Sequence, residues 1–501
     1  MKKVVILFLY IATLVFDGKQ ISSQQDEDVF INETFFIQPT KSLEELHSKI
    51  NALLSNKNLN NFAISVFSLD KGNYYYEQNA DRPLTPASLT KLFTTFNTIK
   101  TFGTNFKVKT QIFADGVIIK DTLRGDLIIK GGGDPLFSIN DIESLADGVS
   151  KFGIKYITGN IIADSRVFDN KLNRIDYSGD RDIVEITPPI SGLAIDKNTV
   201  TVVVNSGSNS SEKPRVQCYP SSDYFKIINN CSVSKSKGRR SRNNVKIKSK
   251  ESGNGLQNIY VSGSIIPRTT YSYQYHINNP ALAFAGTFIN RFNSGKVKIA
   301  GTFKQAKEGT LIFYPNLVLI TEFERDIWDI INITNKNSDN YLAESMFKLY
   351  SGHICRESNK DLESIKDSLS KKLYIHCEEC KLNDGSGLSR RNLVTARSLT
   401  NLLIDVYKSD FKDNFINSLA IAGIDGTLRK RFRSNSTVSN IRAKTGTLRN
   451  ASGLAGFVKT LEGENIAFAF IFNGNDVGYY KSLENQLAEL LATFYIDYSK
   501  K

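Results

Sequence analysis

The chain has 501 residues, of which 41% are hydrophobic and 23% charged, and its formal net charge is +13 at pH 7. A typical domain has about 100–200 residues, so this length predicts two or three structural units. The balance of apolar and charged residues is that of a folded globular protein and excludes a largely disordered one.

An export signal is expected at the N-terminus. Two lysines precede an uninterrupted apolar run at residues 4–16. A membrane-spanning helix needs about 20 apolar residues, so this run is too short to cross a bilayer and instead matches the core of a signal peptide. We therefore expect a signal peptide over residues 1–23, a polar linker over 24–40, and export to the periplasm. Because no small-x-small triplet follows Phe16, an uncleaved anchor is the alternative.

Residues 41–104 are predicted to form the first part of a catalytic domain. Apolar residues recur at helical spacing over 42–56, and a strand pair is expected over 61–70 and 73–78, with its turn at 70–72. The segment LTPASLTKLFTTF follows at 84–96, and its apolar residues form one broad helical face that should be buried. Ser88 and Lys91 lie on this segment, one helical turn apart.

An inserted β-rich region is predicted over residues 105–279, where short β-like runs alternate with Gly, Asn, Ser and Pro. Its most loop-like part should be 205–255. Residues 235–250 carry eight Lys or Arg and no aromatic residue for base stacking, so we expect no nucleic-acid partner. A solvated loop is the simpler interpretation of this basic run, and peripheral association with membrane or wall is the alternative.

Residues 280–501 are expected to complete the catalytic domain. Helical periodicity predicts helices over 280–292, 324–335, 338–350, 395–407 and 481–495, and strands over 439–446, 450–460 and 464–474. The two ends of the chain thus share a helix-and-strand character that the middle lacks. The predicted fold class is α/β (α+β), with a large β-rich insertion.

The Ser88–Lys91 pair suits nucleophilic catalysis. Both side chains share a helix face, and a lysine in a partly dry cleft can lose its proton and act as a base. A serine at a helix N-terminus also lies beside free backbone N–H groups that suit an oxyanion hole. The pair alone is weak evidence. Ser68 and Lys71 have the same spacing, and a serine that only caps a helix N-terminus, followed by a solvated lysine, would give the same pattern.

Two further motifs follow in order. Ser338-Asp339-Asn340 lies in a short polar loop between two predicted helices, which can aim a hydroxyl and an amide into a cleft. Lys444-Thr445-Gly446-Thr447 lies on a predicted strand, where Lys444 can attract a carboxylate and Gly446 has no side chain to block a substrate laid alongside. Together with Ser88–Lys91, these motifs form the signature of penicillin-binding proteins and class A β-lactamases.

With these motifs, the chain resembles the class C low-molecular-mass penicillin-binding proteins, the D-alanyl-D-alanine carboxypeptidase/endopeptidase family. The long stretch between Ser88 and Ser338 leaves room for the large insertion of that family, which a compact β-lactamase lacks. Four other segments are similar to it: GGGDP at 131–135, GNIIADS at 159–165, DGSGLS at 384–389 and AGIDGTLRKRF at 422–432. The resemblance implies a serine β-lactamase/transpeptidase-like domain, an antiparallel sheet flanked by helices.

The resemblance also implies the role of each motif residue. Ser88 would attack the carbonyl between the two terminal D-alanines of a peptidoglycan stem peptide, and Lys91 would take its proton. Ser338 would relay that proton to the leaving amine, Asn340 would hold the peptide amide, and the Lys444–Thr447 motif, with Thr445 and Gly446, would bind the substrate and its terminal carboxylate. β-Lactam antibiotics would be covalent inhibitors, and no cofactor or metal is implied.

Two further positions are implied for the stem-peptide side chain. They are an acid of the inserted region, Asp164, and the arginine after DGSGLS, Arg390; ordinary surface charges are the alternative. Arg449 stands where Gln or another polar residue is expected, so the side-chain preference is left open. The balance between carboxypeptidase and endopeptidase action is also left open.

The five cysteines are an odd number for an exported chain. Cys218 and Cys231 flank a short loop and can pair, as can two of the others. Cys377 and Cys380 have redox or metal spacing, but no second pair completes a metal site, so a surface disulfide or idle thiols are expected.

Other enzyme classes fit less well. Only four His occur, and neither a G-x-S-x-G before a helix nor an H-E-x-x-H is present, which disfavours a Ser-His-Asp hydrolase and a zinc peptidase. A β-lactamase-like hydrolase and a non-catalytic wall-binding protein are the remaining alternatives.

Overall fold

The computed structural model describes residues 39–55, 59–180, 184–208, 211–234, 242–293, 297–307, 314, 317–358 and 377–496. The predicted signal peptide and nearly all of the linker lie outside these residues, as do residues 235–241 of the basic run. Within the described part of the chain, none of the helices combines the length and the apolar character needed to span a membrane.

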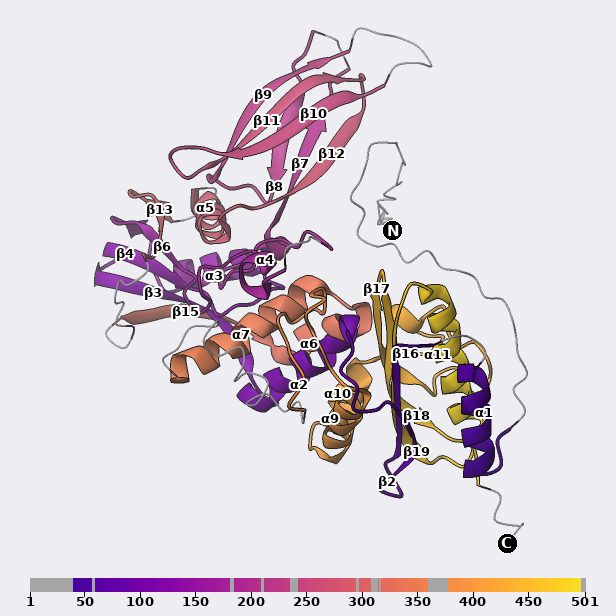
Figure 1. The fold of residues 1–501 in the computed structure, drawn as a ribbon. Coiled ribbons are helices and arrows are strands. Elements are labelled where there is room, and N and C mark those ends of the chain that lie inside the picture. Colours follow the sequence, from indigo (N-terminus) through magenta and orange to yellow (C-terminus); the bar gives the residue numbers. More distant parts are fainter. Residues whose placement is uncertain are drawn as a thin grey trace, which may run out of the picture. The chain divides into compact units, whose positions relative to one another are not determined.

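A six-stranded antiparallel sheet joins the two ends of the chain. Its strand order is β16-β17-β18-β19-β1-β2. The strands are β16 (Ala420–Ile421), β17 (Arg442–Leu448), β18 (Ala451–Lys459), β19 (Asn465–Asn473), β1 (Phe62–Ser68) and β2 (Asn73–Gln78). Segments distant in sequence therefore meet in one sheet, with β1 paired along its length to β19 (Figure 1).

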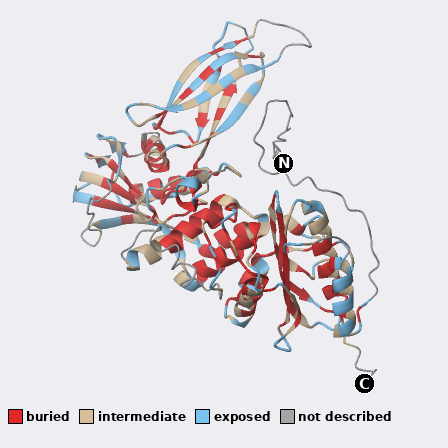
Figure 2. Cartoon of the chain, in the orientation of Figure 1, coloured by how far each residue is buried: buried red, intermediate tan, exposed pale blue. Residues whose placement is uncertain are grey.

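Helices cover both faces of this sheet. Helices α1 (Leu43–Ser55) and α11 (Val477–Ala492) share a hydrophobic core with one face. The other core contains helices α2 (Thr90–Phe102), α6 (Ile327–Asn337), α7 (Asn340–Ser358), α9 (Ala396–Lys408) and α10 (Lys412–Ser418). Because neither face meets water, β18 and β19 are buried almost without alternation; Figure 2 shows this buried centre in red. The predicted α+β fold class is confirmed.

A second sheet of seven strands lies between β2 and α6 in sequence. The order β13-β5-β4-β3-β15 forms its main path, and β6 and β14 join through β4. Its strands are β3 (Lys107–Ile119), β4 (Thr122–Lys130), β5 (Tyr156–Ile157), β6 (Ile161–Asp164), β13 (Lys298–Ile299), β14 (Phe303–Gln305) and β15 (Val318–Asp326). Helix α3 (Ile139–Lys151) packs on this sheet, and the short helix α4 (Arg174–Ser178) follows β6.

Two three-stranded sheets complete the insertion, in the orders β10-β11-β9 and β12-β7-β8. Their strands are β7 (Thr199–Asn205), β8 (Arg215–Tyr219), β9 (Phe225–Val233), β10 (Asn244–Glu251), β11 (Gln257–Ile265) and β12 (Thr270–His276). Inward-facing residues of both sheets share one hydrophobic core with the seven-stranded sheet. The stretch 205–255, expected to be the most loop-like part of the insertion, contains the strands β8, β9 and β10.

Helix α5 (Pro280–Asn293) differs from its expected place. We expected the catalytic part to resume at residue 280, but α5 packs against α3, β6 and β14, and Phe284 and Phe288 lie in the core of the insertion. The boundary was misplaced because helical periodicity predicts that a helix buries one face but not which sheet that face covers. Strand β15 then pairs with β3 and completes the second sheet.

Candidate active site

A tight turn presents Ser88. The serine lies in the 3₁₀ turn η1 (Ala87–Leu89), directly before α2, and its side chain is half-buried. Ala87 adopts φ +50°, a left-handed conformation that is uncommon for a residue with a side chain. The Thr90 hydroxyl donates a hydrogen bond of 2.8 Å to the Ala87 carbonyl and fixes this turn. The nucleophile candidate is therefore held by the start of the helix.

Lys91 is fully buried beside Ser88. Its Nζ lies 2.9 Å from Ser88 Oγ, 2.7 Å from Asn340 Oδ1 and 2.6 Å from the Ser386 carbonyl oxygen. The latter two groups can only accept, so they take the two N–H groups of a neutral amine and leave its lone pair to accept from the Ser88 hydroxyl. This geometry allows a neutral Lys91 to accept the proton of Ser88.

The environment of Lys91 favours its neutral form. Burial lowers the pKa of Lys91 to about 8, against the opposing effect of four nearby carboxylates. A neutral amine is thereby available near neutral pH, which an exposed lysine does not offer.

Two buried carboxylates, Glu344 and Asp384, fix the loop that carries the Ser386 carbonyl. Glu344, on α7, accepts from the backbone N–H groups of Ser386 at 2.9 Å and Gly385 at 3.3 Å, and from the Tyr177 hydroxyl at 2.9 Å. Burial raises the pKa of the Glu344 carboxyl above its ordinary value, and the neighbouring Asp384 carboxylate raises it further. All three partners of Glu344 are donors, so its carboxylate form fits the site best.

Asp384 closes the same loop from inside. Its carboxylate accepts from the backbone N–H groups of Gly387 at 2.9 Å and Ser389 at 2.7 Å. Arg174 Nη1, almost completely buried, donates to Asp384 at 3.0 Å and to Asp180 at 2.5 Å. This ion pair compensates the buried charge. The loop that orients Lys91 is thus fixed by ionic and backbone contacts.

Ser338 lies at the C-terminal end of α6 and also adopts a left-handed conformation, with φ +58°. Its Oγ lies 2.8 Å from Nζ of the fully buried Lys444, which also donates to the Thr445 carbonyl at 2.8 Å. Asn340 Nδ2 donates to Glu185 at 2.7 Å while its Oδ1 faces Lys91. The side-chain amide of Asn340 therefore has a defined orientation, with its oxygen toward Lys91 and its nitrogen toward Glu185.

The insertion contributes two residues that sequence reasoning did not identify. Glu185 accepts from Asn340, and Lys197 pairs with Asp339. Both lie in the stretch after residue 184, which carries no recognisable motif, and their partners are far away in sequence. No sequence signal pointed to them.

Strand β17 brings Lys444 to Ser338 and leaves one edge open. Strand β16 pairs only with Arg442 and Ala443, so within the described residues the edge of β17 from Lys444 to Leu448 faces no strand. An extended peptide can pair with such an edge. Thr445 Oγ1 donates to Thr427 Oγ1 at 2.9 Å, and Thr447 is half-buried.

The structure gives a second reason for a glycine at position 446, in addition to the expected one. A Cβ at this position would lie 2.6 Å from the Pro86 carbonyl oxygen and 3.2 Å from the Leu89 side chain. The absence of a side chain therefore allows β17 to pack against the turn that carries Ser88, and not only a substrate to lie alongside.

The side-chain contacts of Asp164 lie outside this cluster. Asp164 pairs with Arg166, at 2.8 Å and 2.7 Å for its two oxygens, and accepts from the Tyr314 hydroxyl; within the described residues it contacts no motif residue. Burial works to raise the pKa of Asp164, but the hydrogen bonds from Arg166 and Tyr314 outweigh it and hold that pKa below its ordinary value. Arg390 is exposed.

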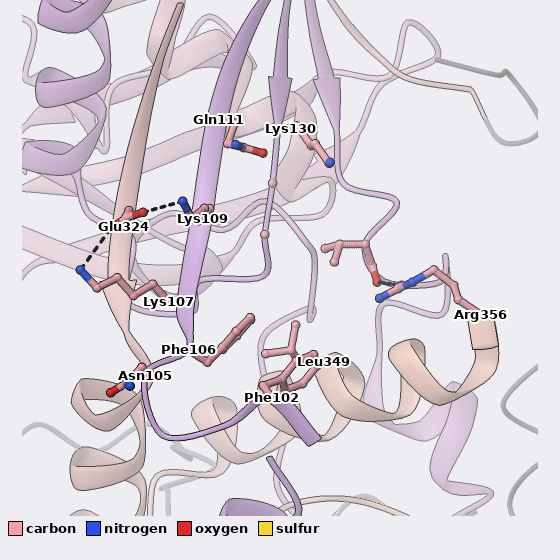
Figure 3. Close-up of a pocket in the computed structure, with 13 residues that line it drawn as sticks. Phe102, Asn105, Phe106, Lys107, Lys109, Gln111, Lys130, Glu324, Leu349 and Arg356 are labelled. Carbon is pink, nitrogen blue, oxygen red and sulfur yellow. Dashed lines mark hydrogen bonds and ion pairs between the residues drawn. The ribbon is translucent and has the colours of Figure 1, made fainter. Parts of the chain in front are cut away.

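The pocket in Figure 3 is separate from this cluster. It has a volume of about 670 Å³ and is lined by residues that include Phe102, Phe106, Lys109 and Arg356. Phe102 ends α2 whereas Ser88 precedes its start, and a helix of this length extends about 20 Å. The chemistry of the motif residues therefore does not take place there.

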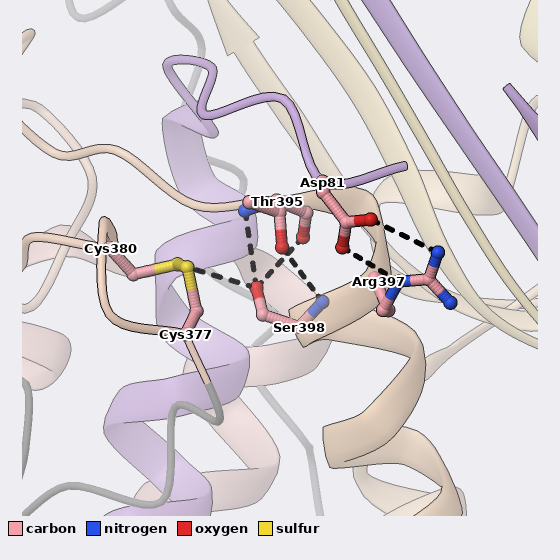
Figure 4. Close-up of a disulfide and its surroundings, with 6 residues drawn as sticks. All are labelled: Asp81, Cys377, Cys380, Thr395, Arg397 and Ser398. Carbon is pink, nitrogen blue, oxygen red and sulfur yellow. Dashed lines mark hydrogen bonds and ion pairs between the residues drawn. A yellow bond between two sulfur atoms is a disulfide. The ribbon is translucent and has the colours of Figure 1, made fainter. Parts of the chain in front are cut away.

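Cys377 and Cys380 form a disulfide near Ser398 at the start of α9, shown in Figure 4. Of the two expected alternatives, a disulfide or idle thiols, the structure shows the disulfide, but Cys380 is 1% exposed, so it does not lie at the surface as expected. Cys218 and Cys231, which could have paired, are both buried and are not bonded to each other. Burial raises the pKa of the Cys218 thiol to about 12, which makes it unreactive.

Known proteins resemble the chain over most of its length. Residues 46–494 match the D-Ala-D-Ala carboxypeptidase 3 (S13) family. The chain is 26% identical to a D-alanyl-D-alanine carboxypeptidase of Actinomadura sp. (strain R39), over 90% of this chain and 85% of that protein. It is also 26% identical to D-alanyl-D-alanine carboxypeptidase DacB of Haemophilus influenzae, over 81% of this chain and 84% of that protein.

The fold is also that of a solved structure. Penicillin binding protein 4 from Haemophilus influenzae superposes with a TM-score of 0.67 at 22% identity, covering 88% of this chain and 99% of that one. A second structure of the same protein, complexed with a β-lactam, gives a TM-score of 0.64 at 22% identity over the same shares of both chains. Both show a likeness of fold that extends over the catalytic part and the insertion.

Proposed function

The chain belongs to the D-Ala-D-Ala carboxypeptidase 3 (S13) family, and from this membership together with the geometry around Ser88 we infer that it is a serine-type D-Ala-D-Ala carboxypeptidase acting on peptidoglycan stem peptides. The observation that carries the assignment is the contact of a fully buried lysine, Lys91, with the Ser88 hydroxyl at 2.9 Å. Such a pair supplies a nucleophile and its base without histidine or metal.

In the proposed reaction Ser88 Oγ attacks the carbonyl carbon between the two terminal D-alanines. The hydroxyl proton passes to the neutral amine of Lys91, and the backbone N–H groups of Ser88 and Thr447 stabilise the oxyanion. Collapse of the tetrahedral intermediate breaks the peptide bond, and the Ser338 hydroxyl, in contact with Lys444, relays the proton held by Lys91 to the amine of the leaving D-alanine. Lys91, neutral again, takes a proton from the water that attacks the acyl-enzyme, and return of this proton to Ser88 Oγ releases the shortened peptide.

Substrate binding is proposed along the open edge of β17. Lys444 and the hydroxyl groups of Thr445 and Thr447 attract the terminal carboxylate, and Gly446 keeps the strand close to Ser88. Asn340 holds the peptide amide. The stem-peptide side chain is proposed to lie between Asp164 and Arg390; because Asp164 already pairs with Arg166, it takes part as a neutral ion pair and not as a lone carboxylate.

The same acylation chemistry predicts covalent inhibition by β-lactams, and the β-lactam complex of penicillin binding protein 4 from Haemophilus influenzae supports this by analogy. Action on peptidoglycan requires an extracytoplasmic location, so we propose that residues 1–23 direct export to the periplasm. Peripheral association with membrane or wall is part of the same proposal.

Incubation of the purified protein with muropeptides, followed by mass spectrometry, tests the assignment. Loss of one alanine from pentapeptides is the expected result, and cleavage of cross-linked dimers to monomers would add endopeptidase action. Rapid hydrolysis of penicillin without alanine release would instead identify a β-lactamase, and no reaction with either would identify a non-catalytic binder.

A further inference from the structure

One outer face of the insertion carries charge of a single sign. In the sheet β10-β11-β9, Lys246, Lys248 and Lys250 occupy alternate, exposed positions of β10. Alternate side chains of a strand point to the same side of the sheet. The register places Tyr260 of β11 opposite Lys248, and Lys226 of β9 in line with Lys250 across β11. Figure 1 shows the three strands β9, β10 and β11.

On this face of the described strands, no acidic residue balances these four lysines. The other outward positions of the same three strands hold Asn, Ser and Ile in addition to Tyr260. Within the described residues none of the four lysines pairs with a carboxylate. The outward positions of the opposite sheet, β12-β7-β8, are mostly Thr, Val, Ser and Gln, and among the described strands they hold one charged residue, Arg215. The charge is therefore confined to one face.

The spacing on this face suits an extended polymer. Lysines two positions apart on a strand are separated by about 7 Å, so β10 presents a row of cations parallel to the strand. Tyr260, at the centre, is 37% exposed, and its ring is accessible to a planar or cyclic group. Repeated cations around one aromatic ring match a chain of sugar rings whose peptide branches carry carboxylates, because carboxylates bind the amines and sugars pack on the ring.

We propose that the face formed by Lys226, Lys246, Lys248, Lys250 and Tyr260 is a second binding surface for the peptidoglycan polymer, which holds the wall through stem-peptide carboxylates while the cleft at Ser88 acts on one peptide. The proposal rests on the proposed function, since that function makes the wall the substrate. A single-stranded nucleic acid fits less well, because such sites offer successive aromatic platforms and this face offers one.

Four lysine-to-glutamine substitutions in the full-length protein (K226Q, K246Q, K248Q and K250Q) test the proposal. The control replaces four exposed lysines on other elements, Lys151, Lys298, Lys304 and Lys408, in the same way. Both proteins are sedimented with purified sacculi at low and high salt, and alanine release is measured from a soluble pentapeptide. The face variant should bind sacculi about tenfold more weakly than wild type at low salt, with the difference lost at high salt, and should keep wild-type kcat/KM on the soluble pentapeptide.

Three results would overturn the proposal: equal sedimentation of the face variant and wild type, an equal loss in the control, or binding of wild type to single-stranded DNA as strong as to sacculi. The sedimentation result does not depend on turnover. If wild type released no alanine from the soluble peptide, the proposed function would fail while the binding surface would still be decided by sedimentation.

Discussion

Acylation of Ser88 should depend on the protonation of Lys91, and this dependence sets a pH profile. Only the neutral amine has a lone pair to accept the Ser88 proton, so the base is present above the pKa of Lys91 and lost below it. With that pKa lowered to about 8, about one-tenth of the molecules hold a neutral amine at pH 7. At the ordinary lysine pKa the fraction would be about 1 in 2,500, so burial raises the reactive fraction about 200-fold.

The assay is the second-order rate of labelling by a fluorescent penicillin between pH 5.5 and 9.5 at constant ionic strength. The neutral fraction of Lys91 rises from about 1% at pH 6 to about 90% at pH 9, so the rate should increase about 90-fold and then level off. In Lys91→Met the rate should be low and without this rise, while a thermal melt checks that the variant is folded. A flat wild-type profile, or the same rise in Lys91→Met, would refute the assignment of Lys91 as the base.

Two substitutions test the surroundings of the site. Gly446→Ala places a methyl group 2.6 Å from the Pro86 carbonyl oxygen, so it should cost about 1–3 kcal/mol of stability and slow acylation. The control is Gly478→Ala, whose Cβ meets open space and which should change neither stability nor acylation. An equal effect of the two substitutions in thermal melts and penicillin labelling would contradict the packing argument. Glu344→Gln leaves buried N–H donors facing an amide and should lower kcat about tenfold with KM unchanged. The control is Glu464→Gln, since Glu464 lies directly before β19 and accepts hydrogen bonds from Ser68 and Tyr75. An unchanged kcat in Glu344→Gln would show that Glu344 does not position the site.

Local spacing was enough to point to the residues that the structure brings together. A serine and a lysine one helical turn apart share a face whatever the rest of the fold does, so Ser88 and Lys91 could be paired from the sequence. The adjacency of Ser338 and Asn340 is equally local. Only tertiary structure shows that Lys444 contacts Ser338. The sequence placed these two residues in one site only through the order of the three motifs.

Contacts between distant segments were not predictable from the same patterns. Glu344 lies four residues after Asn340 on α7, yet its role depends on the backbone of the loop at residues 384–389. Likewise, the Tyr314 hydroxyl that donates to Asp164 comes from a segment 150 residues away. The extent of the insertion was misjudged because α5 has the same apolar period whichever sheet it covers.

The covalent intermediate provides the most direct test of the central claim. Intact-mass spectrometry of the protein quenched during reaction with penicillin should show addition of one drug molecule, and peptide mapping should place it on Ser88. Ser88→Ala, folded by thermal melt, should show no adduct. An adduct on another residue, or an equal adduct in Ser88→Ala, would contradict the account of Ser88 as the nucleophile.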